Sequence, residues 1–185
     1  LLVEPERTNL VTYSSDFSDT SWAKVNATIA PDSIISPDGT LNADKITDDS
    51  TNGVHRIQEG ITTASSGDFT YSVFLKKGTL TTAYFQIYNS GTASTANVDL
   101  DNGTISGGLG FNHKIEDYGN DWYRCSISFI STNTATTVYL YTKQAAAYIG
   151  SGDYLYAWGV SLEEGSYATS YIPTDGGTVT RVQDQ

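Results

Sequence analysis

Tyrosines recur at alternate positions in two short segments, and this spacing is the clearest chemical signal in the chain. Tyr84 and Tyr88 flank Gln86 in one segment, and Tyr139 and Tyr141 stand two residues apart in the other. Alternate residues of an extended strand point to the same side, about 6.5–7 Å apart. Rings at this spacing offer flat, weakly hydrated platforms for the C–H faces of sugars, while neighbouring polar groups hydrogen-bond the hydroxyls. The two segments therefore predict a surface that binds carbohydrate without covalent chemistry.

Two other uses of such a surface remain open on this evidence. Cross-strand tyrosine pairs stabilise an exposed sheet face without any ligand. A tyrosine-rich face also serves contact between proteins, so an assembly domain is the alternative hypothesis.

A third segment adds polar candidates to the predicted surface. Arg56 and Gln58 share one parity opposite Ile57, so both are expected to face outward. His55, just after the Asn52-Gly53 turn, is a further candidate for hydrogen-bonding a ligand. A buried structural histidine is the competing interpretation of His55.

Catalysis has little support in the residue pattern. A glycosidase requires two carboxylates at a defined separation. The adjacent pairs 48–49 and 163–164 would diverge on a strand, and we interpret them as solvated turns or edges. No nucleophile elbow, zinc-binding histidine pair or phosphate loop is found. We therefore predict no catalytic and no metal-binding residues, and a glycan lyase or hydrolase is only the third hypothesis.

The elements that must position these residues are strands. Helical periodicity is nearly absent, and turn signals such as Pro37-Asp38-Gly39 and Asn102-Gly103 separate alternating segments. Each predicted strand has one apolar face; in the last, Tyr154, Tyr156, Trp158, Val160 and Leu162 are expected to share it. The pattern predicts an all-β sandwich or barrel with strands at 69–76, 83–88, 123–129, 138–143 and 154–162, and shorter ones at 41–47 and 54–61.

Composition narrows the class of protein and of partner. The 185 residues suffice for one domain with a real core, and the single cysteine, Cys125, is expected to be a small buried hydrophobe. A net charge of −11 argues against binding nucleic acid, anionic lipid or strongly polyanionic glycans. The sequence contains no window of 18 apolar residues, so membrane insertion is not expected, and it shows no basic and apolar leader typical of a signal peptide. The absence of methionine indicates a fragment or a processed product.

Both ends of the chain carry recognisable motifs. The opening Leu-Leu-Val-Glu-Pro-Glu-Arg-Thr-Asn-Leu and the closing Trp-Gly-Val-Ser-Leu-Glu-Glu-Gly-Ser-Tyr-Ala-Thr-Ser-Tyr-Ile-Pro-Thr resemble a module common in phage tail and tail-fibre-like proteins. Between them, Ser-Pro-Asp-Gly-Thr, Ala-Asp-Lys-Ile, Tyr-Ser-Val-Phe-Leu-Lys-Lys-Gly and Trp-Tyr-Arg-Cys-Ser-Ile-Ser fit the same module. The module is distantly similar to the jelly-roll carbohydrate-binding modules of xylanases and glucanases.

The resemblance implies a fold, a site and a setting. It implies a two-sheet antiparallel β-sandwich, a jelly roll, whose concave sheet contains the segments at 54–61, 83–88 and 138–143 and cradles a polysaccharide or host-surface glycan. It implies a module at 1–172, a linker-like tail at 173–185 leading to other domains, and a place in a virion tail or outside the cell. No cofactor is required. A structural calcium is common in such modules. Here Ser18 follows Phe17 where the pattern has a carboxylate, and the final strand reads Ala157-Trp158-Gly159 where it has an aspartate, so only Asp16, Asp19 and backbone carbonyls are left to hold a calcium ion.

Overall fold

The computed structural model describes residues 4–182 as strands joined by turns. Alternating apolar residues produce these strands, because one side of each can then be buried while the other stays solvated. The strands are β1 (Arg7–Asn9), β2 (Ala23–Val25), β3 (Ala27–Ile35), β4 (Leu41–Asp48), β5 (Asn52–Gly53), β6 (Arg56–Thr62), β7 (Gly67–Lys77), β8 (Thr82–Asn89), β9 (Thr92–Asp99), β10 (Thr104–Gly107), β11 (Phe111–Asp117), β12 (Trp122–Ser131), β13 (Ala135–Tyr141), β14 (Tyr148–Ile149), β15 (Tyr154–Glu164) and β16 (Val179–Arg181).

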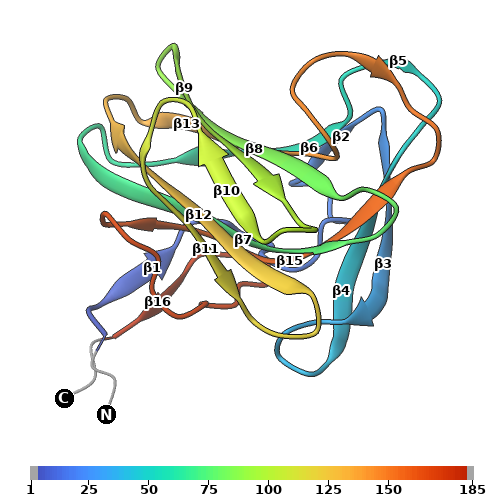
Figure 1. Ribbon diagram of the computed structural model, residues 1–185. Helices are drawn as coiled ribbons and strands as arrows, with labels where there is room; N and C mark the ends of the chain where they lie inside the picture. Colours follow the sequence, from blue (N-terminus) through green and yellow to red (C-terminus); the bar gives the residue numbers. More distant parts are fainter. Residues whose placement is uncertain (1–3, 183–185) are drawn as a thin grey trace.

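Two six-stranded antiparallel sheets form the sandwich, as predicted (Figure 1). The first sheet has the order β10-β9-β8-β13-β6-β2, and the second has the order β11-β12-β7-β15-β4-β3. Sequence-distant strands are neighbours in both sheets, as in a jelly roll. The first sheet brings β6, β8 and β13 together, which are the three strands that carry the predicted surface residues.

The core lies between the sheets and uses the predicted parity on most strands. Ala83, Phe85 and Ile87 of β8 face it, as do Val138 and Leu140 of β13. Cys125 is fully buried there, and this burial raises the pKa of its thiol. The cysteine is therefore a small core residue, as expected.

The five residues of β15 that were expected to share one face are divided between two, because Leu155 and Ala157 face the core before Trp158 and the parity changes after it. Its register against β7 shifts between Trp158 and Ser161, where Gly159 adopts a φ of 63°. A bulge of this kind adds a residue and inverts the parity that follows. Val160 and Leu162 therefore join the main core, whereas Trp158 packs on the outer side of the second sheet.

Some strands were missed by the sequence pattern. β9, β10 and β11 are largely polar and are flanked by turns that contain glycine, and β3 contains Asp32 at a φ of 50°. None of them shows a run of strictly alternating apolar residues.

The segment predicted as a linker-like tail is folded onto the sandwich in its described part. β16 pairs with β1, and the two run side by side at the lower left of Figure 1. Asp175 also bridges to Tyr13, and Ile172 and Thr174 are buried. A boundary at residue 172 therefore does not separate a linker from the domain, and residues 183–185 lie outside the described residues.

In residues 4–182, no helix has the length and apolarity to span a membrane.

Candidate functional site

The register of the first sheet gathers the predicted residues on its outward face. Tyr139 of β13 lies opposite Gln86 of β8 on one side and Gln58 of β6 on the other. One step along the strands, Tyr141 lies between Tyr84 and Arg56 in the same way. Tyr88 pairs with Thr137 one step in the other direction. Seven of the eight predicted site residues thus share one face, which we call the tyrosine face: Arg56, Gln58, Tyr84, Gln86, Tyr88, Tyr139 and Tyr141.

The rings on this face form a packed group around one guanidinium. Tyr84 meets Tyr141 edge-on at a centroid distance of 5.3 Å, and Tyr139 stacks beside Tyr141 at 6.0 Å. The Arg56 guanidinium carbon lies 4.9 Å from the Tyr139 centroid and 5.5 Å from that of Tyr141. Arg56 Nη1 also donates to the Tyr141 hydroxyl at 3.1 Å. These contacts hold the guanidinium against the Tyr139 and Tyr141 rings.

Solvent access differs among the four tyrosines. Tyr88 is 43% exposed, Tyr84 and Tyr139 are half-buried, and Tyr141 is only 4% exposed. Burial raises the pKa of the Tyr141 phenol. The expectation that every tyrosine lies open to solvent is therefore wrong for Tyr141, because Tyr84, Tyr139 and Arg56 pack around its ring. Tyr141 supports the other groups, and the accessible platforms are Tyr84, Tyr88 and Tyr139.

His55 is not on the tyrosine face. Its side chain is fully buried, with Nδ1 2.6 Å from the Asn26 carbonyl oxygen and Nε2 3.1 Å from that of Tyr148. His55 precedes the first residue of β6 and has the parity of Ile57, opposite to that of Arg56 and Gln58, so its inward position follows the alternation of this segment. His55 is therefore a buried structural histidine, as the competing interpretation held.

His55 belongs to a network that anchors residues 142–153 beside the tyrosine face. The Tyr148 hydroxyl donates to Asp48 at 2.9 Å and lies 2.8 Å from the Thr142 hydroxyl. The other Asp48 oxygen accepts the backbone N–H groups of residues 151, 152 and 153 at 2.8–3.0 Å. Burial raises the pKa of Tyr148 to about 12. The loop is therefore held by buried polar contacts directly after β13 ends.

A polar cavity of about 290 Å³ opens at this end of the tyrosine face. Asn97 of β9 lies opposite Tyr84 of β8. Lys143 follows Tyr141 by two residues and so continues the alternation of Tyr139 and Tyr141. Sequence analysis missed most of these residues, because β9 has no apolar run to mark it. The lining consists of Thr82, Ala83, Asn97, Val98, Asp99, Thr104, Ser106, Lys143 and Gln144.

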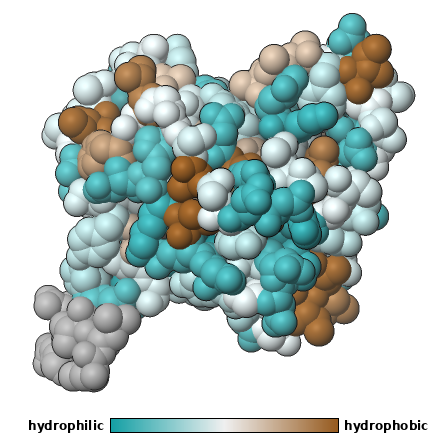
Figure 2. All heavy atoms as spheres, in the orientation of Figure 1, coloured by the Kyte–Doolittle hydropathy of each residue, from teal (hydrophilic) through white to brown (hydrophobic). Residues whose placement is uncertain are grey.

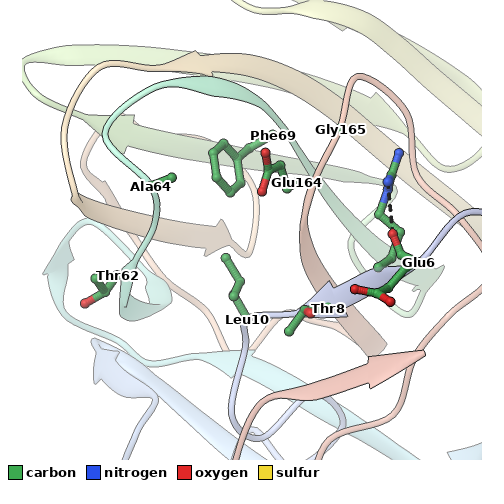
Figure 3. A pocket seen from close by; sticks show the side chains of 9 residues that line it. Glu6, Thr8, Leu10, Thr62, Ala64, Phe69, Glu164 and Gly165 are labelled. Carbon is green, nitrogen blue, oxygen red and sulfur yellow. Dashed lines mark hydrogen bonds between the residues drawn. The ribbon is translucent and has the colours of Figure 1, made fainter. Parts of the chain in front are cut away.

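Two other hollows compete with this site. One, of about 440 Å³, lies where β1, the start of β7 and the end of β15 meet, and Figure 3 shows Phe69 and Leu10 pointing into it beside Glu164. The other, of about 580 Å³, lies on the second sheet between residues 34–41 and 118–122. The first presents one ring. The second combines aliphatic side chains with the Tyr118 and Trp122 rings and the Asn120 amide, but it has no row of tyrosines at alternate strand positions like that of the tyrosine face.

One carboxylate of each adjacent pair is buried, although both pairs were expected to be solvated. Asp48 and Glu163 are buried, whereas their neighbours Asp49 and Glu164 are not. Glu163 accepts the N–H and hydroxyl of Thr169, and burial raises its pKa. Asp48 and Glu163 each organise a loop, and in both pairs the two side chains diverge as the strand geometry requires.

The place where the resemblance implies calcium contains an ammonium group instead. Lys24 Nζ donates to the backbone oxygens of Ser18, at 2.8 Å, and Asp19. Asp16 Oδ1 is already engaged by the N–H groups of Ser18 and Asp19. Within residues 4–182, no cluster of three or more His, Cys, Asp or Glu side chains could hold a metal ion. Calcium needs six to eight oxygen ligands, so these residues do not fit it.

Comparison with known proteins supports the fold. No family model and no curated protein matches the sequence. The crystal structure of the enzymatically active domain of tailspike protein 4 from bacteriophage CBA120 matches at a TM-score of 0.52 and 10% identity, over 83% of this chain and 21% of that one. This chain therefore spans about a fifth of that tailspike chain. The carbohydrate-binding module TmCBM61, solved with β-1,4-galactotriose, matches at a TM-score of 0.51 and 8% identity, over 85% of this chain and 99% of that module. At such identities the likeness concerns the fold alone, a two-sheet β-sandwich that this chain shares with TmCBM61.

Proposed function

We propose that this protein is a non-catalytic module that binds a polysaccharide or cell-surface glycan on its tyrosine face. The observation that carries the proposal is the position of Tyr139 between Gln58 and Gln86, beside Tyr84. Sugar rings would stack on the accessible tyrosines while the flanking amides read hydroxyl groups. A shallow site of this kind implies affinities of roughly micromolar to millimolar.

The Gln58 amide adds a group that is ready for a ligand. Its Oε1 atom is buried without a hydrogen-bond donor among the described residues. Buried polar atoms normally have partners, since leaving one unpaired is costly. Turning the Gln58 side chain outward would bring this oxygen to a ligand hydroxyl on Tyr139 and give it a donor. The resemblance of TmCBM61, which carries bound galactotriose on the same fold, supports the same class of ligand.

The direct test is a binding screen on neutral and acidic polysaccharides with matched variants. Tyr84→Ala and Tyr139→Ala should each weaken binding about tenfold, because each removes a stacking platform. Tyr118→Ala is the matched control: Tyr118 is 48% exposed, but it belongs to the second sheet's hollow. Loss of binding by the control alone, or retained binding by the Tyr84/Tyr139 double variant, would contradict the proposal. Reducing sugar released by the pure protein would contradict its non-catalytic part.

A second candidate function, contact with another protein, rests on an apolar patch elsewhere. Ile35 and Leu41 are 61% and 60% exposed beside Tyr118, and Figure 2 shows hydrophobic atoms gathered at the lower right, over the ends of β3 and β4. Exposed apolar patches often mark protein interfaces. Light scattering tests this function: a stable oligomer that Ile35→Ser dissociates would support it, and a monomer at all concentrations would argue against self-assembly.

We also propose that the module works outside the cell or on a virion tail, as part of a larger protein. A protein outside the cell or on a virion tail encounters polysaccharides and the glycans of cell surfaces. The similarity to the tailspike protein is one precedent for this fold in a phage tail protein. Antibody detection in purified particles and in culture supernatant would test this localisation.

A further inference from the structure

The tyrosine face is almost free of negative charge, although the protein is strongly acidic. Of the 21 acidic residues in the chain, the six strands of the first sheet contain two, Glu59 and Asp99. Glu59 is buried beneath the sheet and accepts hydrogen bonds from Thr12. Asp99 lies at the end of β9, where its oxygens accept N–H groups of residues 101 and 102. Asp99, which lines the polar cavity, is therefore the one carboxylate that these strands place on the outward side, and it lies at the far end of that side from Arg56.

Two cations project on or beside this face without an acidic partner. Within residues 4–182, no carboxylate oxygen lies within 4.0 Å of Arg56 or of Lys143. Arg56 Nε is buried with no acceptor, and Nη1 bonds only the Tyr141 hydroxyl. Lys143 Nζ lies 5.7 Å above the Tyr148 ring and lines the polar cavity. The pKa of Asp153 is lowered mainly by hydrogen bonds from Ser151 and Thr79, and Lys143 adds a smaller contribution through its charge.

Local charge outweighs net charge at such a site. Charges on the rest of the protein act through solvent and are largely screened beyond about 8 Å at physiological salt. A guanidinium is planar and presents paired donors that match the two oxygens of a carboxylate. When that guanidinium lies on a tyrosine ring that also stacks a sugar, a carboxylate on the sugar is within its reach. The net charge of −11 therefore does not exclude acidic glycans, contrary to the expectation from composition.

We propose that the ligand is a glycan with carboxylate-bearing units, of the uronic acid class. Arg56 binds the carboxylate of the unit stacked on Tyr139, and Lys143, which shares the polar cavity with Asp99, adds a weaker attraction for a second acidic unit. Carboxylate is favoured over sulfate because its two coplanar oxygens match the guanidinium fork. This inference rests on the proposed function of the tyrosine face and names the chemistry of its ligand.

The test compares polygalacturonate with its methyl-esterified form, in which the same sugar chain has lost its charge. Binding should be about tenfold tighter to the charged form, and it should weaken as salt rises from about 0.02 M to about 0.5 M. Arg56→Gln should remove most of this preference, and Arg56→Lys should restore only part of it because lysine lacks the fork. Lys143→Gln should reduce the preference by a smaller factor.

Lys114→Gln is the matched control, since Lys114 is an exposed cation of the second sheet that is paired with Glu116. It should leave the preference unchanged. Equal, salt-independent binding of both polymers would overturn the acidic ligand while leaving carbohydrate binding intact. A stronger response to a sulfated galactan than to polygalacturonate would also overturn it. Failure of every glycan to bind would instead reject the proposed function itself.

Discussion

Tyr139 and Tyr141 lie on the same strand and the same face with ring centroids 6.0 Å apart, yet solvent reaches only one of them to any extent. Tyr141 is 4% exposed, and its hydroxyl accepts a hydrogen bond from Arg56. Tyr139 remains half-buried between two glutamines. The pair therefore divides into a support and a platform, although sequence spacing makes them equivalent.

Substitutions at the two positions should separate stability from binding. Tyr141→Ala should lower the free energy of unfolding by about 3 kcal/mol, because it leaves a cavity under Tyr84 and frees Arg56. Tyr139→Ala should change stability by less than about 1 kcal/mol and weaken glycan binding about tenfold. Urea denaturation and isothermal titration on the same samples measure both quantities. Equal stability losses for the two variants would show that the division is wrong.

The outward tyrosines of the first sheet depend on two features, the parity within each strand and the register between strands. Alternation in residues 83–88 and 138–143 predicted two strands and their outward tyrosines, and both strands are present. The contact of these faces depends on β8 pairing with β13, which alternation within either strand does not encode. The family resemblance placed both segments in one sheet, and their pairing and register come from the structure.

Other features escaped because their causes are not local. The bulge at Gly159 inverts the parity of β15, and a side chain at residue 159 would meet the ring of Phe74 on β7, a distant segment. Tyr141 is buried by neighbours from other strands, and His55 by carbonyl groups of residues 26 and 148. Such tertiary contacts decide exposure, whereas sequence periodicity only decides direction.

The buried histidine provides a second prediction. His55→Ala would remove the ring-nitrogen contacts with the carbonyl oxygens of Asn26 and Tyr148 and a ring contact of 4.4 Å with Tyr148, although the Asn26 oxygen would still accept the N–H of Asp49. We expect a loss of about 2–3 kcal/mol in unfolding free energy. Hydrogen exchange in residues 142–153 should increase, because His55 helps anchor that loop.

His113→Ala is the control for this variant. His113 is half-buried and has one ring nitrogen near a carbonyl oxygen, Thr95 O at 2.9 Å. Its loss should cost less than about 1 kcal/mol and leave exchange in residues 142–153 unchanged. If both histidine variants behave alike, the anchoring role of His55 is refuted.

The ammonium of Lys24 leads to a third prediction, on metal dependence. Because Lys24 Nζ donates to two backbone oxygens of the turn at residues 18–19, the protein needs no calcium there. Adding calcium or a chelator should leave the midpoint of thermal unfolding unchanged. Lys24→Ala should lower unfolding free energy by about 1–2 kcal/mol, since hydrogen bonds from a charged group are lost. A midpoint that rises with calcium in the unmodified protein would contradict the ammonium's role.

Asp44 provides the final prediction, on pH. Its carboxylate is buried and accepts the backbone N–H groups of Phe17 at 2.8 Å and Asp32 at 3.0 Å. Burial outweighs these bonds and raises its pKa from 3.8 to about 6. A group whose folded-state pKa is raised stabilises the fold fully below its unfolded pKa and loses that contribution as pH rises through the folded pKa. Asp44 should therefore stabilise the protein more at pH 4 than at pH 7.5, by about 2 kcal/mol.

Asp44→Asn isolates this contribution from those of Glu59 and Glu163, whose pKa values burial also raises. The variant cannot titrate at residue 44, and its amide nitrogen would face one of the two backbone N–H donors, so it should be less stable than the parent protein at every pH. The gap in unfolding free energy should be widest near pH 4 and narrow as pH passes about 6, because only the parent loses stability through this group. Trp22, fully buried beside Phe17, provides a fluorescence signal for the denaturation curves. A gap that is constant across this range would show that Asp44 titrates as an ordinary carboxyl.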